Sequence, residues 1–264
     1  MIKNHERNYT TITSNVHKCV ILAAGSATRL RPLTDAVPKC LLNVGGKPIL
    51  ERTIENILTA GMKDIALVIG YRAEMIREFV RQRFPQQRIR FILNPNYVRT
   101  NNLYSLLLVR RFLEDTSGKI VHSLLLLDSD ILFSNHLLPF LLHDGAKNKI
   151  AVRISGEHNE EEVQVGINSD GNIHFIGKKP ALDMPQCESI GIEVISAEVT
   201  VRLFDILESR VRDGVGRSEF YEAAFQELID EGAILKAVDV SSFPAIEIDT
   251  PEDLELAERL HVNE

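Results

Sequence analysis

Residues 18–39 read KCVILAAGSATRLRPLTDAVPK, and this stretch contains both the first predicted strand and the first candidate ligand-binding loop. The apolar run at 19–23 predicts a buried strand, which ends in the small residues Ala23 to Gly25. Small residues let a ligand approach the backbone, whose N–H groups bind phosphate oxygens in other glycine-rich loops. Because Arg29 and Lys39 follow with positive charge, we expect a phosphate-binding loop after this strand.

Apolar runs and amphipathic segments alternate over the first half of the chain. The predicted strands span residues 19–23, 65–69, 89–93 and 123–127, and the predicted helices span residues 48–60, 73–83 and 102–113. Strands that alternate with helices of this length are typical of parallel sheets with right-handed crossover connections. This half therefore predicts an α/β fold with helices flanking a parallel sheet.

The pattern changes after Lys149, where predicted strands follow one another with short connections. These strands span residues 150–154, 163–167, 173–176, 189–195 and 234–240, and the last three predicted helices span 197–211, 218–231 and 251–260. The sequence NSDGN at 168–172 is a strong hairpin signal. We expect a small antiparallel extension of the sheet, a single domain over residues 18–264, and a polar N-terminal extension at 1–17.

The composition limits the classes of protein to consider. The chain has 264 residues, 44% of them hydrophobic and 25% charged, and a formal charge of −7. This balance predicts a folded protein and argues against nucleic-acid binding, which requires a broad cationic face. No apolar run approaches the ~20 residues of a membrane span, and residues 1–17 lack the apolar core of a signal peptide. We expect a cytoplasmic protein without a membrane span, whose three distant cysteines are reduced thiols.

Two common phosphate-binding motifs do not match this chain. The P-loop pattern G-x-x-x-x-G-K-[ST] fails because Leu41 replaces its first glycine and Pro48 follows Lys47, and the pattern G-x-G-x-x-G fails at Ala27. The stretch LAAGSATRLRPLT followed by PK instead resembles the signature of the sugar-phosphate nucleotidylyltransferases, L-A-A-G-x-G-x-R-x-x-P-x-T followed by P-K. Ala27 departs from that signature, since the family usually has glycine there.

Further segments extend the resemblance over nearly the whole chain after residue 18. Residues 94–97 (NPNY) and 100–106 (TNNLYSL) resemble the segment that places the nucleobase in phosphocholine, aminoethylphosphonate and inositol-phosphate cytidylyltransferases. Residues 125–131 and 247–250 resemble the two metal-binding acidic segments, and residues 176–179 and 188–192 resemble the acceptor-side strands. The resemblance implies the fold of the nucleotide-diphospho-sugar transferases: a Rossmann-like, mixed but mainly parallel sheet flanked by helices, with a small antiparallel extension.

The resemblance also implies Mg²⁺ as cofactor, and the residue chemistry agrees. Asp128 and Asp130 follow a very apolar strand, at the end where open α/β sheets place ligands. Mg²⁺ prefers one or two carboxylates together with phosphate oxygens. We expect Asp130 and Asp249 to hold one ion between the nucleotide α-phosphate and the acceptor phosphate, with Asp128 behind them.

The implied reaction is in-line attack by an oxygen of a small phosphorylated acceptor on the α-phosphorus of CTP, or of another NTP, with release of pyrophosphate. Because the acceptor oxygen is already anionic at pH 7, catalysis requires alignment and charge neutralisation rather than a protein nucleophile. Arg29 is expected to neutralise the leaving pyrophosphate, and Lys39 to bridge the donor and acceptor phosphates. The residues expected to bind the nucleotide are Leu22, Ala23, Ala24, Gly25, Ser26, Ala27, Thr28, Asn101, Asn102 and Ser105.

The acceptor is less constrained by the sequence. Without Trp, and with 6% aromatic residues, the chain is poor in the aromatic cages that bind choline, whereas Glu188 and Glu222 suit a primary ammonium or a polyol. Phe220, Tyr221 and Phe225 lie at helical spacing, which is typical of a core. The residues expected to bind the acceptor are Lys178, Lys179, Glu188, Gly191, Tyr221 and Glu222.

Three alternatives stay open at this point. The first is a nucleotidylyltransferase that uses UTP, dTTP or GTP and a sugar 1-phosphate. The second is a glycosyltransferase with a D-x-D metal site at 128–130, which does not explain Arg29 and Lys39 after the LAAG segment. The third is a non-catalytic nucleotide-binding module, suggested by Ala27. A homodimer is compatible with each of them.

Overall fold

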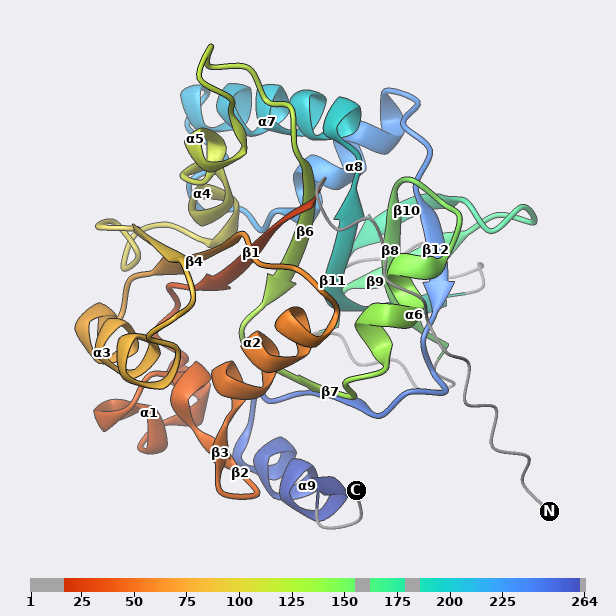
Figure 1. Cartoon of the computed structure of the whole chain (residues 1–264). Helices are drawn as coiled ribbons and strands as arrows, with labels where there is room; N and C mark the ends of the chain where they lie inside the picture. The colour runs from red at the N-terminus through yellow and green to blue at the C-terminus, as the bar shows by residue number, and fades with distance from the viewer. Residues whose placement is uncertain (1–16, 155–161, 179–185, 262–264) are drawn as a thin grey trace, which may run out of the picture.

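The computed structural model describes residues 17–154, 162–178 and 186–261 (Figure 1). Over these residues, nine strands form one central sheet, and two pairs of short strands lie outside it. The sheet strands are β1 (His17–Ala23), β4 (Ile65–Ile69), β5 (Ile89–Leu93), β6 (Ser123–Asp128), β8 (Lys149–Arg153), β9 (Gln164–Ile167), β10 (Ile173–Gly177), β11 (Gln186–Ile195) and β12 (Lys236–Asp239). The short pairs are β2 (Asn43–Val44) with β3 (Lys47–Pro48), and β7 (Ile131–Phe133) with β13 (Ala245–Glu247).

The sheet has the predicted mixed character. Its order is β10-β9-β11-β6-β1-β4-β5, and β8 pairs with both β11 and β12. Strands β6, β1, β4 and β5 are parallel, whereas β11 runs antiparallel to β6, β8 and β9. The hairpin at 168–172 joins β9 to antiparallel β10, with Gly171 at φ 73° in the turn. The expected mainly parallel α/β fold with an antiparallel extension is therefore confirmed.

Helices cover both faces of the sheet (Figure 1). They are α1 (Leu33–Ala36), α2 (Ile49–Thr59), α3 (Ala73–Arg83), α4 (Asn102–Leu107), α5 (Arg110–Leu113), α6 (Leu137–His143), α7 (Ala197–Arg212), α8 (Glu222–Asp230) and α9 (Pro251–His261), with 3-10 turns η1 (Thr28–Leu30) and η2 (Lys39–Leu41). Alternate residues of β1 face opposite cores: Val20 and Leu22 pack with α4, α5, α7 and α8, while Cys19 and Ile21 pack with α2, α3 and α6. The strand is therefore buried on both sides, as its continuous apolar run predicts.

Several predicted boundaries differ from the observed ones. The helix expected at 102–113 is split into α4 and α5, because the N–H groups of Val109 and Phe112 bond three residues back and tighten the turn. The helix expected from residue 218 begins at Glu222, and β1 begins at His17, which the sequence had placed in the N-terminal extension. The strand expected at 189–195 begins at Gln186. Residues 1–16 lie outside the described part of the chain.

A small third core cluster connects the two ends of the chain next to the candidate loop. Leu30, Val44, Ile49, Ile248 and Ala257 are buried together in it. The cluster joins η1, the β2–β3 pair and α2 to α9 and the segment that precedes it. As a result, the residues around 249 lie beside the loop that follows β1, more than 200 positions earlier in the sequence.

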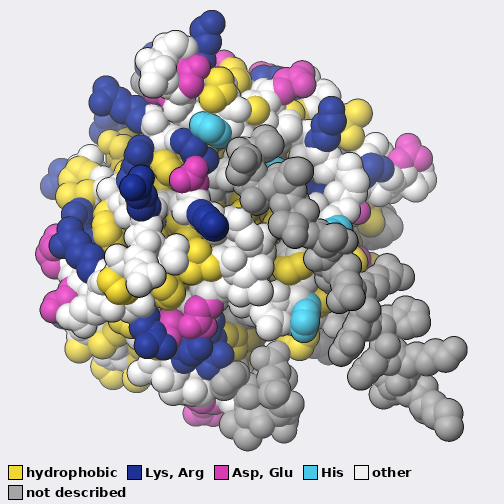
Figure 2. Space-filling view, viewed as in Figure 1, with side chains coloured by type: hydrophobic (Ala, Val, Ile, Leu, Met, Phe, Trp, Pro, Cys, Tyr) yellow, Lys and Arg dark blue, Asp and Glu magenta, His cyan; other side chains and the backbone are white. Residues whose placement is uncertain are grey.

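The free edge of the sheet at β5 is covered by arginine side chains. Residues 72–111 contain nine arginines and two acidic residues, in a chain of net charge −7. Arg77 and Arg81 of α3 lie over the Phe91 ring, and Arg90 lies over the Phe112 ring. Figure 2 shows Lys and Arg side chains gathered along this side of the molecule. Charged edges of this kind oppose pairing with the strands of other molecules.

Two further sequence expectations are tested by the described residues. Cys19, Cys40 and Cys187 are all buried free thiols, as expected. Within the described ranges, no helix combines the length and apolar character that crossing a membrane requires.

Candidate active site

A cavity of about 290 Å³ opens at the carboxyl ends of β1 and β6. This is the edge at which open α/β sheets bind ligands. The loop after β1, the segment after β5, the end of β6, the middle of β11 and residues 247 and 249 all contribute to its wall. The position of the cavity thus follows from the strand order rather than from any single motif.

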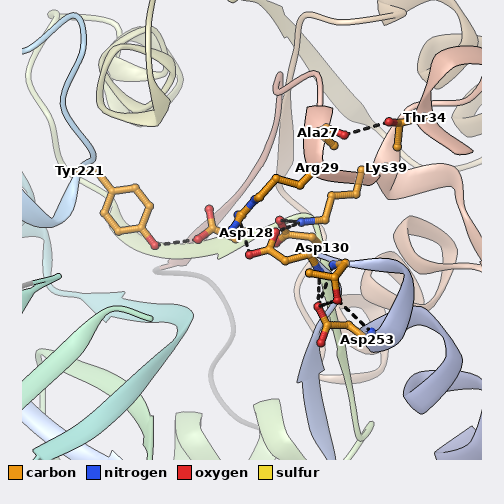
Figure 3. A network of polar contacts seen from close by, with 10 residues as sticks. Ala27, Arg29, Thr34, Lys39, Asp128, Asp130, Tyr221 and Asp253 are labelled. Carbon is orange, nitrogen blue, oxygen red and sulfur yellow. Dashed lines mark hydrogen bonds and ion pairs between the residues drawn. The ribbon is translucent and has the colours of Figure 1, made fainter. Parts of the chain in front are cut away.

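The loop after β1 is held in one shape by bonds within the loop and to its surroundings. Ala27 has left-handed backbone angles (φ 47°, ψ 54°), and its carbonyl accepts a hydrogen bond of 2.8 Å from Thr34 Oγ1 (Figure 3). Tyr71 Oη donates to the Thr34 carbonyl at 2.8 Å. Leu30 is fully buried in the third core cluster. The loop is therefore fixed beside the cavity before any ligand binds.

Lys39 lies at the centre of the charged part of the cavity (Figure 3). Its Nζ donates to Asp130 Oδ2 at 2.6 Å and to Asp249 Oδ1 at 2.5 Å. Arg29 contacts the other oxygen of Asp249 at 2.7 Å. Thr250 and Asp253 bond to each other at the start of α9 and hold the backbone of Asp249. Three segments far apart in the sequence, around residues 29–39, 130 and 249–253, thus meet at one carboxylate–ammonium cluster.

The charges of this cluster stabilise one another. Burial disfavours the ammonium form of Lys39, but the carboxylates of Asp130 and Asp249 outweigh burial and raise the pKa of Lys39. Burial likewise opposes the ionisation of Asp249, yet Lys39 and Arg29 lower the pKa of Asp249. Lys39 is therefore a permanent cation and Asp249 an anion at neutral pH, as binding of phosphates and a divalent ion requires.

Three carboxylates could share a metal ion here. Asp130, Glu247 and Asp249 each offer one oxygen, and these oxygens lie within 4.8 Å of one another. Asp130 Oδ1 is buried and has no hydrogen-bond partner among the described residues. A donor set made only of oxygens suits Mg²⁺, so the residues fit the expected ion. The sequence predicted Asp130 and Asp249 as ligands but missed Glu247, the last residue of β13.

Asp128 forms the floor of the cavity and is tied to the core. Tyr221 Oη lies 3.0 Å from Asp128 Oδ2 (Figure 3). The same oxygen lies 3.2 Å from Oε1 of the fully buried Glu193. Burial, and then the charges of Asp130 and Glu193, raises the pKa of Asp128. Gly191 (φ 68°) lies against this floor, and a Cβ atom there would come within 2.8 Å of Asp128 Oδ2. Only glycine leaves that space open.

The expected nucleotide side of the cavity is built from the segment after β5 and the start of α4. Asn101 Oδ1 accepts from the Asn102 N–H at 2.8 Å and so caps α4, while Asn102 Oδ1 accepts from the Tyr221 N–H at 2.9 Å. The buried Asn94 side chain donates to Ser105 Oγ at 3.0 Å. These bonds hold the polar wall rigid, and Asn94 and Tyr97 are lining residues that the expected set did not include.

Lys178, Phe220 and Glu222 form another part of the cavity wall. Lys178 follows β10, and its Nζ lies 4.6 Å from the centre of the Phe220 ring. Glu222 begins α8 and is 8% exposed. Burial raises the pKa of Glu222 to about 7, although a backbone hydrogen bond and the charge of Lys178 act in the other direction.

Most of the expected site residues line this one cavity. They are Leu22, Ala23, Ala24, Gly25, Ala27, Arg29, Lys39, Asn101, Asn102, Ser105, Asp130, Lys178, Gly191, Glu222 and Asp249.

Four expected residues in the described part of the chain are not among the lining side chains. Tyr221 is 1% exposed and points to Asp128 and Glu193, so it supports the cavity floor from the core. Glu188 instead faces Arg153, at 3.8 Å. Ser26 and Thr28 flank the left-handed turn at Ala27, and Thr28 is exposed at the start of η1. Lys179 lies outside the described residues.

Known proteins resemble this chain in sequence. The nucleotidyl transferase family model matches residues 18–240. Choline-phosphate cytidylyltransferase of Streptococcus pneumoniae is 38% identical over 99 residues, which are 38% of this chain and 42% of that protein. CMP-5'-(3-aminopropyl)phosphonate synthase of Streptomyces rubellomurinus is 32% identical over 135 residues, 51% of this chain and 20% of that protein. The chain thus spans less than half the length of either relative.

The fold also matches solved structures. The CTP:phosphocholine cytidylyltransferase from Streptococcus pneumoniae superposes with a TM-score of 0.75 at 23% identity, over 93% of this chain and 99% of that one. This likeness concerns the fold. The sequence match runs from β1 through β12 and includes the loop, Lys39 and the end of β6. The chain therefore belongs to the nucleotidyl transferase family.

Proposed function

We propose that the chain is a Mg²⁺-dependent nucleotidylyltransferase that transfers CMP from CTP to a small phosphorylated alcohol or phosphonate and releases pyrophosphate. The observation that carries this proposal is the convergence of the loop after β1, Lys39, Asp130 and Asp249 in one cavity. The choice of CTP rests on the two relatives whose names include cytidylyl or CMP transfer.

The reaction forms a bond between an acceptor oxygen and the α-phosphorus and breaks the bond from that phosphorus to the bridging oxygen of pyrophosphate. The backbone of the loop binds the triphosphate, since its small residues allow close approach. Arg29, half-exposed at the cavity entrance, neutralises the leaving pyrophosphate. Lys39 has its ammonium group between Asp130 and Asp249 and there balances charge on the reacting phosphates.

Asp130, Asp249 and Glu247 would hold the divalent ion. When bound, that ion supplies a Lewis acid that polarises the α-phosphate. The protein residues fix the geometry: Tyr221 holds Asp128 below the reacting groups, and the bonds at the start of α9 hold the backbone of Asp249. No protein group has to take a proton, because the acceptor oxygen enters as an anion.

Pyrophosphate release tests this function directly. Purified protein with Mg²⁺ is incubated with CTP, UTP, dTTP or GTP and a panel that includes phosphorylated alcohols, phosphonates and glucose 1-phosphate. We expect CTP with a small phosphorylated alcohol or phosphonate to react fastest. Preference for a sugar 1-phosphate with another nucleotide would favour the sugar branch. Absence of turnover with every pair would favour the non-catalytic module.

Two variants test the assigned roles. We expect Asp130→Asn and Lys39→Ala each to slow turnover at least ~100-fold, because each removes a charge aimed at the reacting phosphates. Lys47→Ala is the matched control, since Lys47 pairs with Glu55 away from the cavity. Near-normal turnover of Asp130→Asn or Lys39→Ala would remove that residue from its role.

A further inference from the structure

The part of the cavity wall formed by Lys178, Phe220 and Glu222 contains an unsatisfied buried carboxylate oxygen. Glu222 is 8% exposed, and its Oε2 has no hydrogen-bond partner among the described residues. Leaving such an acceptor unpaired is unfavourable, and more so for a charged group, because its lost hydration is not replaced. Because Glu222 lines the cavity, a donor group of a bound ligand is the natural partner for this oxygen.

The Phe220 ring next to it already holds an ammonium group. Phe220 is 42% exposed and lines the cavity, and the Lys178 Nζ lies 4.6 Å from its ring centre. Aromatic faces attract cations at such distances. The pair of Phe220 and Glu222 therefore offers a cation two favourable contacts, a ring face and a buried carboxylate.

Lys178 connects this part of the cavity wall to the metal-binding carboxylates. Its charge acts on both Glu222 and Asp249. Because Asp249, Phe220 and Glu222 line the same cavity, a short ligand with its phosphorus group near Asp249 can place its other end near Phe220 and Glu222. That orientation is the one an acceptor needs under the proposed function, on which this inference rests.

We propose that the acceptor carries a primary ammonium group, which Glu222 and Phe220 bind at the part of the cavity wall that they form with Lys178. The N–H bonds of a primary ammonium satisfy Glu222 Oε2, whereas a quaternary ammonium has no proton to donate. Among the described lining residues, Tyr97 and Phe220 are the aromatic ones, and Tyr97 belongs to the nucleotide side. One ring face does not make a cage for a trimethylammonium group.

Under this proposal, the Lys178 side chain has one position without acceptor and another with acceptor bound. Without acceptor, its ammonium group occupies the face of Phe220. When the acceptor ammonium takes that face, Lys178 is displaced and pairs with the phosphate or phosphonate group of the same molecule. Binding of the two ends of the acceptor is therefore coupled through one lysine side chain.

Three acceptors of similar size test the proposal: phosphoethanolamine, phosphocholine and propyl phosphate, each with CTP and Mg²⁺. We expect kcat/KM for phosphoethanolamine to exceed that for either of the others at least ~10-fold, since a buried charged contact contributes at least that much. Glu222→Gln should reduce the ratio of kcat/KM for phosphoethanolamine to kcat/KM for propyl phosphate at least ~10-fold. Glu188→Gln should retain the ratio, because Glu188 faces Arg153 and does not line the cavity.

Several outcomes would overturn the inference. Equal or better use of phosphocholine contradicts the need for an N–H donor, and an unchanged ratio in Glu222→Gln contradicts the assigned residue. If Glu222→Gln does not fold, Phe220→Leu replaces it, with an expected two- to ~30-fold loss of the same ratio. If no acceptor yields pyrophosphate, the proposed function fails. Calorimetric binding of the three compounds then tests the ammonium site alone, and equal binding of all three, or none, rejects it.

Discussion

Replacing Ala27 by glycine should stabilise the protein, although glycine usually destabilises. Ala27 has φ 47° and ψ 54°, a left-handed conformation that costs a residue with a Cβ atom about 1–2 kcal/mol. Glycine has no such cost but loses more chain entropy on folding, about 0.5–1 kcal/mol. The hydrogen bond from Thr34 Oγ1 ends on the carbonyl of residue 27, which glycine retains. The net expected gain is about 0.5–1 kcal/mol.

Urea denaturation, monitored by circular dichroism, measures this gain as a higher midpoint concentration of urea with an unchanged slope of the unfolding free energy against urea concentration. For a chain of this size, the melting temperature should rise by about 1–4 °C. Ser26→Gly is the matched control, since among the described non-glycine residues only Ala27 and Arg72 have positive φ. That control should lose stability. A loss in Ala27→Gly equal to the loss in Ser26→Gly would refute the assignment of strain to this turn.

Three further perturbations test the site by stability. Glu222→Gln should be about 3 kcal/mol more stable than the native protein at pH 8 and equally stable near pH 4. The pKa of Glu222 is about 7 in the folded protein and 4.5 in the unfolded chain, so the unfolded chain releases its proton first and the stability of the native protein falls as the pH rises from 4.5 to 7. Equal curves of stability against pH for the two proteins would contradict this. Tyr221→Phe should lower the free energy of unfolding, measured in urea, by about 1–3 kcal/mol, because Asp128 and the buried Glu193 lose their shared hydrogen-bond partner. An unchanged urea midpoint would mean that this hydroxyl contributes nothing to stability. Millimolar Mn²⁺ should raise the melting temperature of the native protein and raise that of Glu247→Gln less, and an equal rise would remove Glu247 from the ligand set.

The sequence predicts the parallel half of the fold well because its strands are long and its helices strongly amphipathic. Strands β7 and β13 were missed because each has only three residues, and helix α6 was missed because its sequence, LLPFLLH, is apolar at almost every position and shows no helical periodicity. Those short elements decide the site: β13 pairs with β7 and thereby brings Glu247 beside Ile131, next to Asp130. The missed metal-binding candidate is therefore a consequence of a missed short strand.

The acceptor side shows a second limit of sequence reasoning. Glu188 and Gly191 were expected to face one pocket, but strand alternation would put them on opposite faces. The pairing of β11 with β8 shifts register between Ser189 and Glu193. Gly191 lines the cavity while Glu188 turns to Arg153. Despite this shift, the two residues lie on different sides as alternation predicts, and the expectation of one shared pocket came from the resemblance.

Under the proposed function, charge explains why the metal and the cationic loop would be needed together. The cavity is lined by five carboxyl groups, on Asp128, Asp130, Glu222, Glu247 and Asp249, against three cationic side chains, on Arg29, Lys39 and Lys178. A nucleoside triphosphate adds several negative charges, and burying unpaired charge is costly. Lys39 is already engaged by two aspartates, so it cannot balance the triphosphate alone. A divalent ion on Asp130, Glu247 and Asp249 would balance those aspartates and free Lys39 for the reacting phosphates, so nucleotide binding and metal binding should each strengthen the other.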